Sequence, residues 1–253
     1  MILNRLGNKS KLVDKLLPLF PRHDIYMEMF LGAGGMFFNK PRAKYNFIND
    51  LDHDVYNLFR QVLDNKEELL EWIIKTPITE RQFKEWGKGK REDTDLMNAI
   101  RFIWISNFGL YGKPNTLRIG AVNPRAMILK NMEQTFEWLS NAYLFNVDFR
   151  KFFSKCDYKG NIQRCFVYAD PPYLNTDNNY SDGFVEQDSI DLFNTLCNSG
   201  VKFAMSEFDH PVIMREVEKR GLNLIVIGER QNIANRRVEV LVTNYNTNQT
   251  SLF

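Results

Sequence analysis

The sequence predicts an α/β protein whose core is a mostly parallel sheet of seven strands with a reversed last strand. Short apolar runs alternate with helical patterns along most of the chain, which is typical of a sheet covered by helices. Only residues 228–237 separate the last two runs, and 253 residues with 44% hydrophobic content suffice for one large domain with an insertion. The strand candidates are residues 25–30, 45–50, 143–148, 165–169, 201–205, 223–227 and 238–245.

Helical patterns lie between most of these strands. Apolar residues at helical spacing follow Asn8, which can cap a helix that ends near residues 18–21, and they recur over residues 55–63. Parallel neighbours need long crossovers, so this alternation predicts a parallel sheet. Residues 228–237 carry no helical stripe and are too few for a crossover. The last two strands should therefore form an antiparallel hairpin at the sheet edge.

Nothing near the N-terminus predicts export or membrane insertion. Residues 1–12 carry basic side chains but no apolar core of signal-peptide length. No stretch approaches the roughly eighteen uninterrupted apolar residues that a membrane span requires. The formal net charge is +2, which by itself implies no nucleic-acid partner. We expect a cytoplasmic protein with no membrane partner.

The cysteines and histidines do not predict a metal site. The three cysteines form an odd set without Cys-x-x-Cys spacing, and the three histidines lie far apart in the sequence. We expect incidental or buried thiols, surface or helix-capping histidines, and no bound metal. These residues are Cys156, Cys165, Cys197, His23, His53 and His210.

The most informative motif is Asp170-Pro171-Pro172-Tyr173, which follows the apolar run at residues 165–169. The prolines fix φ and remove two backbone donors, so nearby carbonyls stay free to accept hydrogen bonds. The Asp170 carboxylate and the Pro171 carbonyl can each accept one N–H of an exocyclic amino group on a nucleobase, and Tyr173 can stack on a flipped-out base. This grouping suits alkylation of that amino group. The plain alternative is a strand that ends in a Pro-Pro turn with a chance aspartate.

A second group of motifs indicates a nucleotide-like cofactor. Residues 30–35 read Phe-Leu-Gly-Ala-Gly-Gly after the first strand, where glycines let backbone approach a ligand and place N–H groups at a helix N-terminus. Asp50 ends the second strand, where a carboxylate can receive both hydroxyls of a ribose. Asp52 is best interpreted as a helix cap. Asp148 could accept an adenine amino group, and a helix cap is an equally good interpretation.

Together these motifs make the chain resemble the Dam-type DNA adenine-N6 methyltransferases (D12 class, alpha group). The resemblance implies a Rossmann-like methyltransferase sheet with an inserted, mainly helical target-recognition domain. It divides the chain into a catalytic domain, residues 1–51 and 143–253, and a recognition insertion, residues 52–142. It implies S-adenosyl-L-methionine as cofactor and site-specific methylation of double-stranded DNA, with a GATC-like site as a starting guess. It also implies a bacterial or phage-infected cell. A solitary enzyme, a phage-encoded enzyme and the modification half of a restriction pair stay open alternatives, and in the last case the cognate restriction endonuclease is not physically required.

The same resemblance assigns roles to individual residues. The segment at residues 4–9 is similar to the N-terminal cofactor motif of the family, although Arg5 stands where many members carry an aromatic residue and Asn8 where they carry a second glycine. The implied catalytic residues are Asp170, Pro171, Pro172 and Tyr173. The implied cofactor-binding residues are Arg5, Gly7, Lys9, Phe30, Gly32, Gly34, Asp50, Asp148 and Asp170.

The insertion carries the charge pattern expected of a DNA-facing surface. Residues 96–132 contain five basic residues and no Asp or Glu, and avoidance of negative charge suits a phosphate-facing surface. The turn-rich segment at residues 109–118 resembles the recognition hairpin of the family, and residues 100–108 are expected to be helix core. The basic residues between Lys84 and Arg91 are balanced by nearby acids. They can contact phosphates, or they can simply form a solvent-exposed helix face. The expected DNA-binding residues are Lys113, Asn115, Arg118 and Arg125.

Other acceptors remain open on the sequence alone. The alternatives are cytosine N4 in DNA, adenine in RNA, and a protein glutamine amide. Enzymes acting on those often carry Ser or Asn at the position of Asp170, so the aspartate favours DNA adenine. A DNA-binding regulator that keeps the fold without turnover is a further alternative, which the intact Asp170, Tyr173 and glycine motif oppose.

Overall fold

The computed structural model describes residues 1–4, 9–113, 116–118, 120, 123–174, 183–231 and 236–247. The chain forms two compact units. The insertion unit comprises Met1–Lys11, Gly32–Asn39 and Asp50–Asn146, and the sheet unit comprises Leu12–Leu31, Lys40–Asn49 and Val147–Phe253. Thus Met1–Lys11 and Gly32–Asn39, which begins at the first glycine of the motif, cluster with Asp50–Asn146.

Seven strands form a sheet in the order β3-β2-β1-β4-β5-β7-β6. β1 runs parallel to β2 and β4, and β4 runs parallel to β5. β7 runs antiparallel to both of its neighbours, β5 and β6. The expected Rossmann-like methyltransferase sheet with a reversed last strand is confirmed, and the reversed strand is inserted beside the edge strand β6. The strands are β1 (Ile25–Glu28), β2 (Tyr45–Asn49), β3 (Tyr143–Phe145), β4 (Cys165–Ala169), β5 (Lys202–Phe208), β6 (Asn223–Gln231) and β7 (Arg236–Thr243).

The strand bounds differ from the predicted ones for identifiable reasons. Every residue of β1 and β4 is buried, as expected of parallel strands covered on both faces. β3 is shorter than predicted because the backbone N and O of Val147 bond to the side chain of Asn49. β5 is longer than predicted because Glu207 and Phe208 pair with β7. Strand length here depends on partners that one sequence does not reveal.

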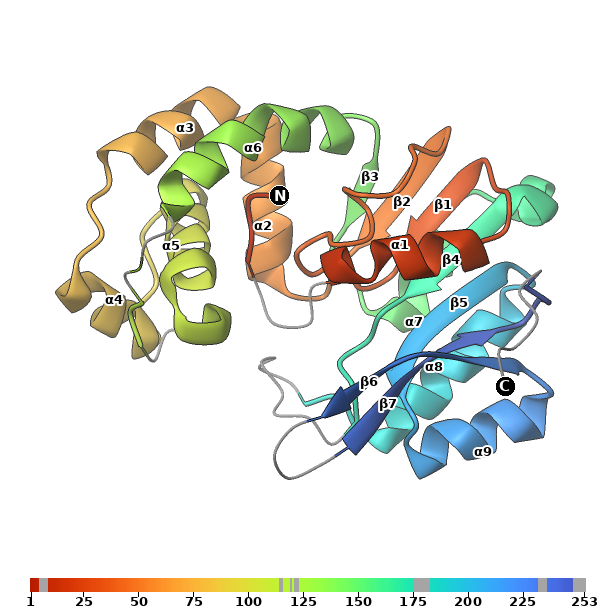
Figure 1. The fold of residues 1–253 in the computed structure, drawn as a ribbon. Coiled ribbons are helices and arrows are strands. Elements are labelled where there is room, and N and C mark those ends of the chain that lie inside the picture. Colours follow the sequence, from red (N-terminus) through yellow and green to blue (C-terminus); the bar gives the residue numbers. More distant parts are fainter. Residues whose placement is uncertain are drawn as a thin grey trace. The chain divides into compact units, whose positions relative to one another are not determined.

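Figure 1 shows the helices of the sheet unit, of which α8 is the longest with 13 residues. Side chains cap α7 and α9. Phe20 packs its ring on Phe166 and Tyr168 of β4, so the segment that leads into β1 covers one face of the sheet. The helix predicted after Asn8 is instead three short helical segments that end at Leu19, and Asn8 itself lies outside the described residues. His210 caps its helix through Nδ1, which accepts from Val212 N at 3.3 Å. The helices are α1 (Val13–Leu16), η2 (Leu17–Leu19), α7 (Phe149–Lys155), η4 (Lys159–Arg164), α8 (Glu186–Asn198) and α9 (Pro211–Arg220).

The insertion unit is mainly helical. Asp52 caps its first long helix by accepting from Asp54 N at 2.9 Å, which confirms the predicted cap. The predicted apolar core at residues 100–108 is confirmed, since the large side chains there are buried. Asp54 forms ion pairs with Arg91 and Arg101 and so ties three segments together. The helices are η1 (Lys9–Lys11), α2 (His53–Asp64), α3 (Lys66–Lys75), α4 (Glu80–Gly87), α5 (Asp95–Phe108), η3 (Leu110–Gly112) and α6 (Pro124–Leu139).

All three cysteines are free, and two of them are buried. Burial raises the pKa of the Cys156 thiol to about 12 and that of Cys165 to about 11. Within the described residues, no group of three or more His, Cys, Asp or Glu side chains is arranged to hold a metal ion. No helix in the described part of the chain has the length and apolar character needed to cross a membrane.

Candidate active site

The carboxyl ends of β1 and β4 lie side by side because the two strands are parallel and in register, with Glu28 opposite Tyr168. Met29 N donates to Tyr168 O at 3.3 Å, which continues this pairing past the end of β1. Phe30 therefore leaves the sheet next to Asp170. In open α/β sheets this edge is where ligands bind.

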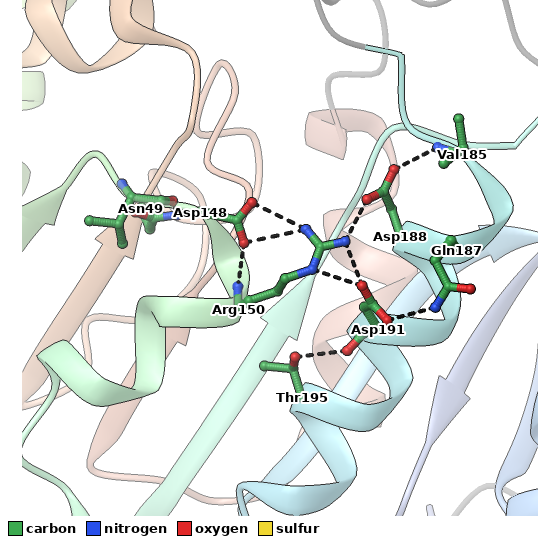
Figure 2. Close-up of polar contacts among 9 residues, drawn as sticks. Asn49, Asp148, Arg150, Val185, Gln187, Asp188, Asp191 and Thr195 are labelled. Carbon is green, nitrogen blue, oxygen red and sulfur yellow. Dashed lines mark hydrogen bonds and ion pairs between the residues drawn. The ribbon is translucent and has the colours of Figure 1, made fainter.

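Asn49, the last residue of β2, organises this edge, and no sequence motif identified it. Its side chain is 1% exposed. Its Nδ2 donates to Met29 O at 3.0 Å and to Val147 O at 2.9 Å, and its Oδ1 accepts from Val147 N at 3.0 Å. One amide thus fixes the backbone immediately before Phe30 and immediately before Asp148. Figure 2 shows Asn49 beside Asp148. The available signal was a polar residue at the end of a buried strand.

Asp148 caps α7, since its Oδ1 accepts from Arg150 N at 2.8 Å. The guanidinium of Arg150 also forms ion pairs with Asp148, Asp188 and Asp191, which join the first turn of α7 to the first turns of α8 (Figure 2). The capping interpretation of Asp148 is confirmed. Its role toward an adenine amino group stays a prediction, and the shared guanidinium fixes where its carboxylate points.

The motif predicted to be catalytic, residues 170–173, directly follows β4. Asp170 and Pro172 are half-buried and Pro171 is buried. The Tyr173 hydroxyl donates to Glu239 Oε1 at 3.1 Å, and its ring meets Phe208 edge-on, with centroids 4.7 Å apart. Burial, followed by the charge of Asp170, raises the pKa of Tyr173 well above its ordinary value. Tyr173 is therefore a neutral donor at physiological pH.

A second buried polar group lies on β1 and the segment that follows it. The Tyr26 hydroxyl donates to Glu28 Oε2 at 2.6 Å, and Lys40 Nζ lies 3.9 Å from the centroid of the Tyr26 ring. Lys40 Nζ donates to Asn46 Oδ1 at 3.3 Å. Burial lowers the pKa of Lys40 to about 8, and the charge of Glu28 opposes this shift. The sequence signal for this group was a charged residue, Glu28, inside an apolar strand candidate.

The glycine motif and Asp50 are joined directly within the insertion unit. Gly32 N donates to Asp50 Oδ2 at 2.6 Å, and Asp52 N donates to Asp50 Oδ1 at 2.9 Å. Gly32 has a φ of +53° with open space where a Cβ would stand, whereas a Cβ on Gly34 would lie 2.3 Å from the Phe38 ring. Each carboxylate oxygen can accept more than one hydrogen bond. A buried acid beside an open glycine turn therefore fits a ribose.

Two details of this motif differ from the prediction. The glycines lead into consecutive turns, not a helix, with Phe38 N bonded to Gly34 O at 3.0 Å and Asn39 N to Met36 O at 3.1 Å. The Gly32 N–H donates to Asp50 and is not held open at a helix N-terminus. Lys9 is described and 4% exposed. Arg5 and Gly7 lie outside the described residues, so their roles stay predictions.

The predicted recognition hairpin begins where α5 ends. Gly109 forms an antiparallel bridge with Leu117, and Arg118 N donates to Phe108 O at 2.7 Å. A Cβ at Gly109 would lie 2.1 Å from Lys113 O, so this turn requires glycine. Arg118 is exposed and Lys113 is half-buried, whereas Asn115 lies outside the described residues.

Some basic residues of this unit already have protein partners. Arg125 donates through Nη2 to Thr76 O at 2.6 Å and lies 5.3 Å from the Trp104 ring centroid. Arg101 is 6% exposed and pairs with Asp54. In the upstream cluster, Lys84 pairs with Glu80 and Lys90 with Glu85. Of the predicted DNA-binding residues, Arg125 thus also has a structural contact, and its DNA role stays a prediction.

Comparison with known proteins identifies the family. The StsI modification methylase of Streptococcus sanguinis is 25% identical over 99% of this chain and 43% of its own length. The type II methyltransferase M1.LlaDCHI of Lactococcus lactis subsp. cremoris is 25% identical over 94% of this chain and 93% of its own length. The chain thus spans less than half of the first of these relatives. A solved rRNA methyltransferase of Streptomyces viridochromogenes covers 95% of this chain and 85% of its own, with 11% identity and a TM-score of 0.41. The model of the D12 class N6 adenine-specific DNA methyltransferases matches residues 6–235, and the chain belongs to this family.

Proposed function

We propose that this protein transfers a methyl group to N6 of adenine at a specific site in double-stranded DNA. The observation that carries the proposal is Asp170-Pro171-Pro172-Tyr173 at the carboxyl end of β4, beside the end of β1, in a chain that matches this family over residues 6–235. The aspartate at the first position favours adenine in DNA over the other acceptors. The methyl donor is S-adenosyl-L-methionine.

The chain's own residues supply acceptors and orientation. Bound S-adenosylmethionine supplies an electrophilic methyl group, and Asp50 with the turn at Gly32 would hold its ribose. Asp170 and the Pro171 carbonyl each accept one N–H of the adenine amino group, which leaves the nitrogen lone pair on the third side. The carboxylate of Asp170 stabilises the positive charge that develops on the nitrogen. Proton loss to this carboxylate or to water follows transfer.

Tyr173 provides the face on which a flipped adenine stacks. Enzymes that modify a base in a duplex must first take the base out of the helix, and aromatic rings commonly hold it there. Because Tyr173 stays protonated, its hydroxyl is a hydrogen-bond donor and not a base. The ring thus contributes binding and alignment, whose value in a methyl transfer comes from holding the reacting atoms in line.

The DNA site is read by the insertion, residues 52–142, in this proposal. Arg118 and Lys113 lie in or beside the hairpin that follows α5, within a stretch without acidic residues. Basic side chains on such a surface contact phosphates or base edges. Relatives of this chain are named modification methylases, and we propose the same modification role here. Base-resolution mapping of methylated adenines on one plasmid gives the recognition site.

A single labelling experiment tests the activity. The protein is incubated with S-adenosylmethionine labelled in its methyl group and, separately, with unmethylated plasmid DNA, RNA and protein. We expect label in DNA alone, recovered as N6-methyladenine by mass spectrometry of the digested nucleosides. N4-methylcytosine, or label in RNA or protein, would refute the adenine assignment. Binding of DNA without any label transfer would instead favour a regulator of the same fold.

A further inference from the structure

We propose that Glu239 is a positioning residue that fixes the ring of Tyr173 for stacking on the flipped base. This inference rests on the proposed function and adds to it a residue outside the sequence motifs. Glu239 lies on β7, far from Tyr173 in the sequence, and accepts its hydroxyl at 3.1 Å. Both residues belong to the sheet unit.

The sheet register explains how β7 reaches the catalytic motif. Glu239 is paired directly with Phe208 of β5, so both side chains lie on the same face of the sheet. Tyr173 contacts this pair twice, by its hydroxyl to Glu239 and by its ring edge-on to Phe208. Two contacts at different ends of a ring determine both its position and its plane.

The local irregularity of the sheet supports a functional origin for this arrangement. The pairing of β6 and β7 shifts register between Val226 and Gly228, and Gly228 is the partner of Glu239. Bulges change the direction of side chains and occur often next to active sites. In this sheet the register shift lies directly opposite Glu239, whose carboxylate accepts the hydrogen bond of Tyr173.

The burial of Glu239 argues in the same direction. Its side chain is 3% exposed, and removing a carboxylate from water costs free energy that its contacts do not always recover. A well-packed apolar residue at this position would stabilise the fold more than a buried carboxylate does. The hydrogen bond to the ring that stacks on the substrate is therefore better explained by a role in positioning Tyr173 than by stability.

The test compares Glu239→Ala, Glu239→Gln and Tyr173→Phe, with Glu216→Gln as a matched control. Glu216 is also 3% exposed, lies in the sheet unit and pairs with Arg220, away from the catalytic motif. The measurements are kcat and the KM for DNA, cofactor affinity by calorimetry, and the fluorescence of 2-aminopurine placed at the target adenine. The fluorescence reports base flipping separately from methyl transfer.

We expect Glu239→Ala to lower kcat by about tenfold, as loss of one net hydrogen bond implies, and to change the 2-aminopurine signal. Glu239→Gln should recover most of the loss because its amide oxygen still accepts from Tyr173. Tyr173→Phe should match Glu239→Ala, and the double variant should be no worse than either single one. Cofactor affinity should stay unchanged, and Glu216→Gln should leave kcat and the fluorescence as in the wild type.

Three outcomes would overturn the inference. They are an additive double variant, a Glu239→Ala protein that loses thermal stability with normal kcat and fluorescence, and a Glu239→Gln protein as impaired as the alanine variant. If Glu239→Ala does not fold, kcat and the 2-aminopurine signal of Tyr173→Phe still test the inference, because this variant removes the same hydrogen bond and keeps the ring. Failure of the proposed function is separate, since it would appear as absence of N6-methyladenine with the wild-type protein.

Discussion

Replacing Asn49 with alanine should weaken cofactor binding as well as stability, although Asn49 belongs to no known motif of the sequence. The substitution removes three hydrogen bonds, to Met29 O and to both Val147 N and Val147 O. At about 1 kcal/mol for each bond, the free energy of unfolding should fall by about 3 kcal/mol. For a chain of this size that is a fall in Tm of roughly 6–12 °C. The backbone that positions Phe30 and Asp148 also loses its common support.

Asn46→Ala is the matched control for this prediction. Asn46 lies on the same strand, is 2% exposed, donates to Ala43 O at 3.1 Å and accepts from Lys40. It lies toward the amino end of β2, away from the edge that carries the cofactor motifs. Denaturant unfolding should therefore show a loss of stability in both variants, while calorimetry with S-adenosylmethionine shows weaker binding only for Asn49→Ala. Equal cofactor affinity in Asn49→Ala and the wild type would refute the reasoning.

Four further predictions address the chemistry and the electrostatics. Asp50→Ala should weaken S-adenosylmethionine binding by about 1.5 to 3 kcal/mol for each ribose hydrogen bond lost, and unchanged calorimetric affinity would contradict the ribose role. Asp170→Asn should keep at most about a hundredth of the wild-type kcat, and near-normal label transfer would contradict its role in charge stabilisation. Arg118→Ala should weaken DNA binding and, if Arg118 contacts phosphate, reduce the salt slope by about one unit, as titrations at several salt concentrations would reveal. Burial lowers the pKa of Lys40 to about 8, so between about pH 8 and pH 10.5 the unfolded chain binds more protons than the folded one, and this residue makes the free energy of unfolding rise with pH. The free energy of unfolding of Lys40→Met should lack this rise, and identical pH profiles of the variant and the wild type would contradict the assignment.

Local sequence patterns predicted the fold, and the same local reasoning gave a candidate site whose roles stay predictions. The alternation of strands and helices predicted the sheet, and the short connection before β7 predicted its reversal. Asp170 and Tyr173 could be singled out as candidates because they lie within four consecutive residues. Glu239 and Asn49 were not, since their importance depends on strand register, which a single sequence does not specify. At the glycine motif the sequence instead predicted too much, because a helix was expected where the chain makes turns.

Charge counting reached a similar limit in the insertion. The absence of acids over residues 96–132 identified a basic stretch, but it could not separate exposed cations from paired ones. Arg101 is paired with Asp54, which comes from outside that stretch, and Arg125 is bonded to Thr76 O. Arg118 is exposed. Only the tertiary partners of each side chain distinguish a structural arginine from one that can meet DNA.

The hairpin predicted to read DNA and the sheet edge predicted to carry out methyl transfer are held by different kinds of contact. This difference bears on how the recognised DNA sequence can change. The described contacts that close the hairpin join backbone atoms, namely Gly109 with Leu117, Leu110 N with Thr116 O, and Arg118 N with Phe108 O. Such contacts tolerate substitution of most side chains, with Gly109 as the exception that sterics impose. The carboxyl edge of the sheet is instead held by side chains such as Asn49, whose replacement disturbs several backbone segments together. Substitutions in the hairpin are therefore expected to alter the DNA sequence that is methylated while the methyl transfer itself is retained.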